Sequence, residues 1–207
     1  MTTQQPDIVV FNTNSFHLMA ARGDGLTRFR DLNLQLSGPS NVDTTLNRNN
    51  IITYRVDQYQ LYLDKLYYYG FYAKDKAKTL NGVTPTPYQG FRPNHKLPEA
   101  KVIAYAFEQV DLPVAFTGQL LIGIDFLPDY GSWMVGSSEP FAFELVLALY
   151  FEDGRLGEVK DHSEGAAHWR DWIVRRNTGT LPAGAKPPAE MRALTEMMSL
   201  YKNIRLY

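Results

Sequence analysis

Alternating apolar residues mark the clearest strands of this 207-residue chain. Over residues 114–126 every even position is apolar or glycine, whereas the odd positions include polar residues such as Gln119. Residues 141–151 repeat the pattern on odd positions, although the opposite face there also carries Val146 and Tyr150. A period of two predicts strands with one buried face. The second face of the 141–151 strand is expected to be partly covered as well.

Turn residues place further strands around these two. Asp153-Gly154 follows the second strand, and this dipeptide accepts the positive φ angles of a two-residue turn, so a β-hairpin is predicted there. The returning strand should cover residues 155–159. Additional strands are predicted at residues 8–11, 32–36 and 102–110.

A block of tyrosines stands out between Tyr54 and Tyr72, which holds seven of the thirteen tyrosines in the chain. Apolar residues alternate through Val56 and then shift phase at Tyr59, and a bulge would explain this shift. Spacings of three and four also fit a helix. The enrichment in tyrosine, isoleucine and threonine favours strand. Tyrosine suits surfaces that are partly exposed to solvent, because its ring is apolar and its hydroxyl needs a hydrogen-bond partner.

The remaining segments combine a long loop with helices. Residues 79–98 contain four prolines and two glycines and predict a loop without a regular element. A helix is predicted from an N-cap at Ser163 to its C-terminus at Asn177. An extended proline-rich linker follows, and a second helix begins near Pro188. Its apolar stripe is expected to dock on its own domain or on a neighbour, and consists of Met191, Leu194, Met198 and Tyr201.

Together these patterns predict a mainly β protein. Many short strands followed by helices favour an antiparallel, jelly-roll-like β-sandwich over an alternating βαβ fold. We expect the sandwich domain to span residues 1–160. Residues 161–207 are expected to form a helical and extended C-terminal arm.

Composition narrows the range of functions. The chain has no cysteine, which excludes disulfides, cysteine nucleophiles and thiolate metal sites. A net charge of −1 gives no bulk attraction to nucleic acid or anionic lipid, and the local basic group of Arg170, Arg175 and Arg176 fits a helix C-terminus. No run is long and apolar enough for a membrane span, and no signal peptide is recognised. We expect a protein made in a cytoplasm.

No motif carries a specific chemistry, so we predict neither an enzyme nor a bound cofactor. The sequence contains no nucleophile elbow and no phosphate-binding glycine loop. His162, Glu164 and His168 could in principle ligate a metal, but a helix starting at Ser163 would leave His162 outside it. A metal-dependent enzyme therefore remains a lesser alternative.

Glycines raise two further points. The tripeptide Arg22-Gly23-Asp24 matches a known integrin-binding motif, but the simpler expectation is an ordinary tight turn. Gly118 and Gly123 fall inside a predicted strand, where they indicate a bulge or a close backbone approach.

These observations favour a structural, self-assembling protein. A tyrosine-rich face, a proline-rich loop and a tethered apolar helix suit contacts between copies of the chain and other structural subunits. The favoured interpretation is a capsid protein or another virion component of a virus or phage, made in the host cytoplasm. The alternative is a β-barrel or sandwich that binds a small molecule or a glycan. The candidate interface residues are Tyr59, Tyr62, Tyr67, Tyr68, Tyr69, Tyr72, Trp133, Met191, Leu194, Met198 and Tyr201.

Overall fold

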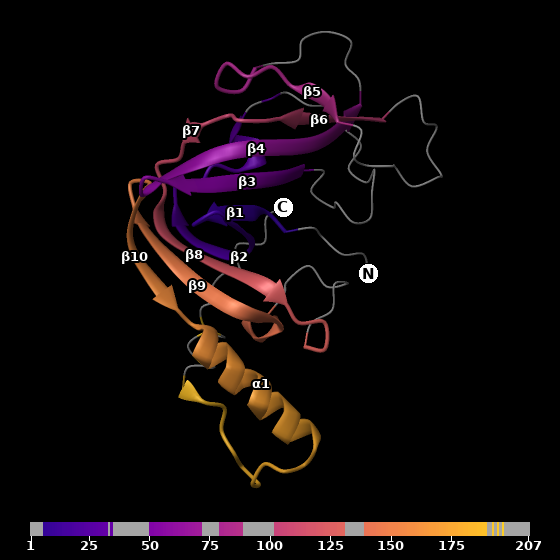
Figure 1. The fold of residues 1–207 in the computed structure, drawn as a ribbon, viewed down its shortest axis with the longest axis vertical. Helices are drawn as coiled ribbons and strands as arrows, with labels where there is room; N and C mark the ends of the chain where they lie inside the picture. The colour runs from indigo at the N-terminus through magenta and orange to yellow at the C-terminus, as the bar shows by residue number, and fades with distance from the viewer. Residues whose placement is uncertain are drawn as a thin grey trace.

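A computed structural model describes residues 6–32, 34, 50–71, 79–88, 102–130, 139–189, 192, 194 and 196. These residues form a sheet and one C-terminal α-helix (Figure 1). The elements are β1 (Ile8–Phe11), β2 (Asn14–Asp24), the 3-10 helix η1 (Phe29–Leu32), β3 (Asn50–Asp57), β4 (Gln60–Phe71), β5 (Thr86–Tyr88), β6 (Val102–Phe107), β7 (Leu112–Pro113), β8 (Thr117–Phe126), the 3-10 helix η2 (Pro140–Ala142), β9 (Phe143–Glu152), β10 (Arg155–Asp161) and α1 (Ser163–Asn177).

The strands make one mixed sheet in the order β10-β9-β8-β2-β1-β3-β4-β6-β5, with β7 also paired to β4. Neighbours are antiparallel except β1 and β3, which run parallel. β10 also pairs with β4 at Arg155 and Gln60, and this pairing closes a ring of hydrogen bonds through seven strands. The mainly β prediction with a C-terminal helix is confirmed. A sandwich of two separate sheets is not what the hydrogen bonds show.

The two strands predicted from alternation are confirmed as β8 and β9. Both strands bury residues on both faces, because the inner face lines the main core and α1 covers part of the outer face. The expected second covered face of β9 is confirmed by Val146, which is buried together with Ala166 and Trp169 of α1. For β8 the prediction of a single buried face was wrong, since Leu121 is as buried as Leu120.

The hairpin at Asp153-Gly154 is confirmed, with φ angles of 47° and 77°. The tyrosine block is also strand, as the composition favoured. The phase shift at Tyr59 is not a bulge, however, but the turn between β3 and β4, where Gln58 and Tyr59 have φ angles of 47° and 65°. The bulge lies further on, at Asp64, which has no partner in the register between the two strands.

Three other expectations need correction. The strand predicted over residues 32–36 is wrong at its start, because Leu32 ends the 3-10 helix η1, while residues 33, 35 and 36 lie outside the described residues. The 79–98 loop contains a regular element, β5, while residues 89–98 lie outside the described residues. Arg22-Gly23-Asp24 is not a tight turn but the end of β2, paired with β8.

The predicted helix is confirmed as α1, and it ends at Asn177 as expected. Ser163 is its first residue rather than its N-cap. The Ser163 backbone N–H donates to Asp161 Oδ1 at 2.8 Å, and the Ser163 hydroxyl accepts a hydrogen bond from the Val146 N–H at 3.1 Å. α1 is held on the sheet by Arg170, which donates to the carbonyl oxygens of Phe141 and Phe143 at 3.2 and 2.7 Å. Arg170 therefore serves helix docking.

Two histidines flank this docked region. Burial lowers the pKa of His17, whose ring meets Phe143 edge-on at 5.5 Å. Burial, followed by the charge of Lys160, lowers the pKa of His162, although Asp161 acts in the opposite direction. The Nε2 atom of His162 is buried without a hydrogen-bond partner among the described residues.

Both histidines should make stability depend on pH. The unfolded chain binds protons on histidine near pH ~6.5, whereas the folded protein resists them, so the unfolded state gains protons first on acidification. The free energy of unfolding should be constant above about pH 7 and fall as the pH drops to about 5.5. Thermal unfolding midpoints of the wild type and of the His17→Gln/His162→Gln variant test this. The double variant should lose less stability on acidification than the wild type. Equal losses would contradict the assignment of the pH dependence to these two histidines. His168→Gln, at an exposed position on α1, is the control.

Candidate self-association surface

The outer face of the β3–β4 hairpin carries the surface tyrosines. Along β4, Leu61, Leu63 and Leu66 point into the core, while Tyr62 and Tyr67 lie half-buried on the opposite face. This separation follows from strand alternation, which the bulge at Asp64 shifts by one residue. The outer face therefore combines aromatic rings with the polar residues between them.

Arg55 is the centre of a polar network on this face. Its guanidinium contacts Asp57 at 2.8 Å, Asp64 at 3.2 Å and Asp111 at 2.5 Å. It also lies over the Tyr62 ring, 5.2 Å from the centroid. Burial alone would lower the pKa of Arg55, but these hydrogen bonds raise it above its ordinary value. The network fixes the Tyr62 side of the face in one arrangement.

A second polar group surrounds Tyr67. Glu108 accepts hydrogen bonds from the Tyr67 hydroxyl at 2.5 Å and from the Lys65 ammonium at 2.8 Å. Burial and this hydrogen bond raise the pKa of Tyr67. The Tyr67 ring lies 4.8 Å from the ring of Tyr88 on β5, and Tyr88 is 38% exposed. The two rings form a small aromatic platform bordered by opposite charges.

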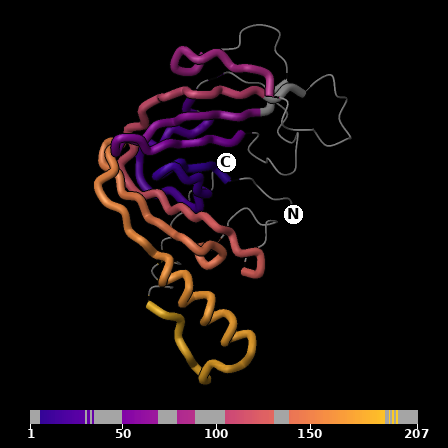
Figure 2. The backbone as a smooth tube through the Cα atoms, viewed as in Figure 1, coloured from indigo at the N-terminus to yellow at the C-terminus, as the bar shows by residue number. Residues whose placement is uncertain are grey.

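Tyr59 lies at the tip of the hairpin and is 72% exposed. Its backbone is fixed, because its carbonyl oxygen accepts a 2.7 Å hydrogen bond from Leu156 in β10. Leu61 N–H donates to Gly154 O at 2.8 Å, so the β3–β4 and β9–β10 turns are bonded to each other. Figure 2 shows these two turns meeting at one edge of the molecule. Tyr59 is thus a large ring held outward on a rigid support.

Apart from Leu194, the predicted interface residues fall into three groups. Tyr59, Tyr62 and Tyr67 lie on the surface described above. Tyr68 is 3% exposed and stacks in the core, 5.4 Å from Tyr105, and burial raises its pKa to about 12. It therefore offers no surface to a partner. Outside the described residues lie Tyr72, Trp133, Met191, Met198, Tyr201 and the side chain of Tyr69.

Leu194 represents the apolar stripe of the C-terminal segment in the described structure. It is 1% exposed and packs with Ala166 and Trp169 of α1. In Figure 2 the chain after α1 turns back alongside the helix. Of the two docking alternatives, Leu194 follows the intramolecular one.

Tyr88 belongs to this surface but was not predicted. It lies among the prolines of residues 79–98, which the sequence assigned to loop, and β5 is only three residues long. A strand that short carries no alternation from which its outward residues could be read. The proximity to Tyr67 depends on the pairing of β5 with β6, which a single sequence does not disclose.

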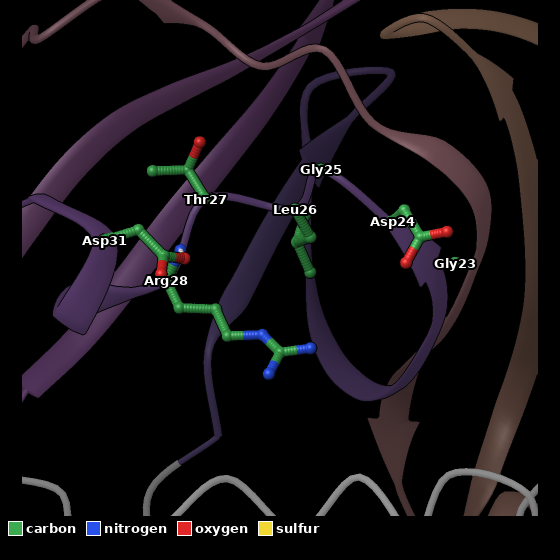
Figure 3. A pocket seen from close by; sticks show the side chains of 7 residues that line it. All are labelled: Gly23, Asp24, Gly25, Leu26, Thr27, Arg28 and Asp31. Atoms are coloured by element: carbon green, nitrogen blue, oxygen red, sulfur yellow. Dashed lines mark hydrogen bonds between the residues drawn. The ribbon is translucent and has the colours of Figure 1, made fainter.

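A cavity of about 350 Å³ opens beside the end of β2 (Figure 3). Its walls combine glycine backbone, one apolar side chain and charged groups, and Arg28 N–H donates to Asp31 Oδ2 at 2.8 Å. In Figure 3 the side chains of Leu26 and Arg28 extend toward one side and that of Thr27 toward the other. The lining residues are Gly23, Asp24, Gly25, Leu26, Thr27, Arg28 and Asp31.

The alternative metal site is not assembled. Across the described ranges, no three histidine or carboxylate side chains lie close enough to share an ion, and His162, Glu164 and His168 are all among the residues searched. His168 and Glu164 are exposed on α1. The same part of the chain holds no helix with the length and apolar character needed to cross a membrane. No known family model, curated protein or solved structure matches the chain.

Proposed function

We propose that this chain is a structural, self-assembling protein, a capsid or other virion component of a virus or phage, which associates with copies of itself. The observation that carries the proposal is Tyr59. A tyrosine residue that is 72% exposed, on a turn with a φ of 65°, has both an unfavourable backbone conformation and apolar surface in water. A contact that buries the ring offsets both costs.

The geometry of the β3–β4 turn supports a role for the Tyr59 ring in binding a partner. Tyrosine is enriched at the energetically important centres of interfaces. Because the hydrogen bonds to Leu156 and Gly154 already hold the turn, little backbone conformational entropy is lost when the ring is captured. The half-buried Tyr62 and Tyr67, with the charges around Arg55, supply the polar rim that surrounds such a centre.

The other parts of the proposed interface carry less weight. Leu194 packs on its own chain, so the C-terminal arm supports self-association less than Tyr59 does. The proline-rich loop contributes through Tyr88, whose ring extends the tyrosine face toward β5. In the finer fold assignment, also a proposal, the curved sheet is a jelly-roll-like sandwich, since residues of β3, β4, β8 and β9 share one core.

Tyr59→Gly tests the role of the exposed ring. Glycine adopts positive φ without strain, so the free energy of unfolding should change by less than about 1 kcal/mol, because relief of strain and added chain entropy oppose each other. Self-association should nevertheless be lost, which sedimentation velocity over a concentration series measures.

Thr13→Gly is the matched control. Asn12 and Thr13 form a turn with φ angles of 47° and 66°, the same geometry as at Gln58 and Tyr59. This variant should therefore show a similar small change in stability and assemble like the wild type. If Tyr59→Gly assembles as well as Thr13→Gly, Tyr59 is not the anchor.

One observation favours the alternative of a glycan-binding protein. Tyr67 and Tyr88 form an aromatic platform beside Glu108 and Lys65, and rings next to hydrogen-bonding groups suit the two kinds of surface on a sugar. Titration of the protein with soluble oligosaccharides separates the two functions. Saturable binding that Tyr88→Ala removes, in a protein that stays monomeric, would favour the alternative.

A further inference from the structure

The exposed ring of Tyr59 and the cavity at Gly23–Asp31 lie at the same end of the sheet. The contacts that connect them run through the segment preceding β8. Gly25 lies so close to Ala115 that a Cβ there would be 2.2 Å from its carbonyl oxygen, and Gly154 lies equally close to Val114. Gly154 in turn accepts a hydrogen bond from Leu61, next to the Tyr59 turn. One end of the molecule thus presents both a projecting ring and an open cavity.

The cavity matches a tyrosine side chain in size and chemistry. Its volume of about 350 Å³ exceeds that of a phenol ring. Leu26 provides apolar contact, and Arg28 and Asp31 are charged residues of the lining, where Asp31 already accepts a hydrogen bond from the Arg28 N–H. A tyrosine needs this combination, because its ring is apolar and its hydroxyl must be paired when buried.

The same segment already pairs with a tyrosine of its own chain. From the core side, the hydroxyl of the fully buried Tyr54 donates to the Thr27 carbonyl oxygen at 2.7 Å. The backbone over residues 25–28 is therefore fixed from within. The backbone at the cavity and the backbone at the Tyr59 turn are both held by hydrogen bonds, which reduces the backbone entropy lost on binding.

We propose that the Tyr59 ring of one copy inserts into the Gly23–Asp31 cavity of a second copy. Since each copy carries both parts at one end, two copies related by a two-fold axis exchange rings reciprocally and form a symmetric dimer. This dimer is the building unit of the assembly, and the inference rests on the proposed self-assembly function. It adds the partner surface that the tyrosine face alone does not identify.

Photo-crosslinking tests the insertion directly. The variant Tyr59→p-benzoylphenylalanine keeps an aromatic ring at an exposed turn, so the fold should be retained. An equal mixture of ¹⁵N-labelled and unlabelled chains of this variant is irradiated, and the crosslinked peptides are identified by mass spectrometry. We expect crosslinks from position 59 to residues 23–31 that join labelled to unlabelled chains. Tyr88→p-benzoylphenylalanine is the control, and its crosslinks should not reach residues 23–31.

The outcomes separate this inference from the proposed function. If the protein assembles but position 59 crosslinks elsewhere, or to residues 23–31 only within one chain, the reciprocal dimer is wrong and self-assembly stands. If the wild-type protein is monomeric throughout the concentration series, both are wrong. Arg28→Trp, which places a second large ring in the cavity, should weaken association while Tyr59 is intact. Unchanged association of this variant would also contradict the insertion.

Discussion

Gly118→Ala should destabilise the protein by about 3 kcal/mol or more, enough to prevent folding if the protein is marginally stable. Gly118 faces Gly23 across β8 and β2. A Cβ at Gly118 would lie 2.1 Å from Arg22 O and 2.7 Å from Gly23 Cα, so the two backbones would have to separate. Its φ of 151° is in addition rarely adopted by a residue with a side chain. Denaturant unfolding measures the loss.

Two other glycines provide matched controls. At Gly82, φ is 81° but a Cβ would meet nothing within 4 Å, so Gly82→Ala should show the backbone strain alone, about 1 kcal/mol. Gly157 has open space and no positive φ, so Gly157→Ala should change stability by less than about 0.5 kcal/mol. If Gly118→Ala were no worse than Gly82→Ala, the close approach of β2 and β8 would be wrong.

Phe143→Ala should cost about 3–5 kcal/mol, the usual range for removing a fully buried aromatic ring. Phe143 is 0% exposed and begins β9 beneath α1. Its ring meets the rings of His17 and Phe126, each at 5.5 Å. The loss should therefore affect both the sheet and the docking of α1, which thermal unfolding followed by near-ultraviolet circular dichroism detects.

A double-mutant cycle with Gly123 tests the packing of this ring. A Cβ at Gly123 would lie 2.7 Å from Cγ of Phe143, so Gly123→Ala should be destabilising while the ring is present. In the Phe143→Ala background the same methyl group enters space that the ring has left. The double variant should thus lose less than the sum of the single losses. Strict additivity would show that the ring is not packed against Gly123.

Local pattern predicted the strands well where each strand has a clear boundary. The alternation over residues 141–151, followed by Asp153-Gly154, was sufficient for β9, the turn and β10. The close approach at Gly118 also followed from a glycine inside a strand. The prediction of one polar face on β8 failed because α1, more than thirty residues later in the sequence, helps to cover it.

The turn at Gln58 and Tyr59 shows where sequence reasoning fails. Two-residue turns with positive φ are recognised by glycine or asparagine, and this one contains neither. The pairing of β10 with β4 supplies hydrogen bonds that hold these residues in an unfavourable conformation. Because that support comes from residues 154–156, local propensity cannot predict it.

The candidate site was predictable only in part. Strand periodicity implies that the tyrosines of β4 alternate between core and surface. The bulge at Asp64 decides which of them face the core, and it places Tyr68 there. The cavity could not be predicted, since Arg22-Gly23-Asp24 looked like a turn, whereas its pairing with β8 leaves Gly25 to Arg28 to form the wall.

The native mass of the wild-type protein tests the central claim most directly. Size-exclusion chromatography with light scattering, run over a wide concentration range, should show the 23.6 kDa chain forming a dimer and larger species built from even numbers of chains. A monodisperse monomer at the highest concentration would contradict self-assembly through Tyr59.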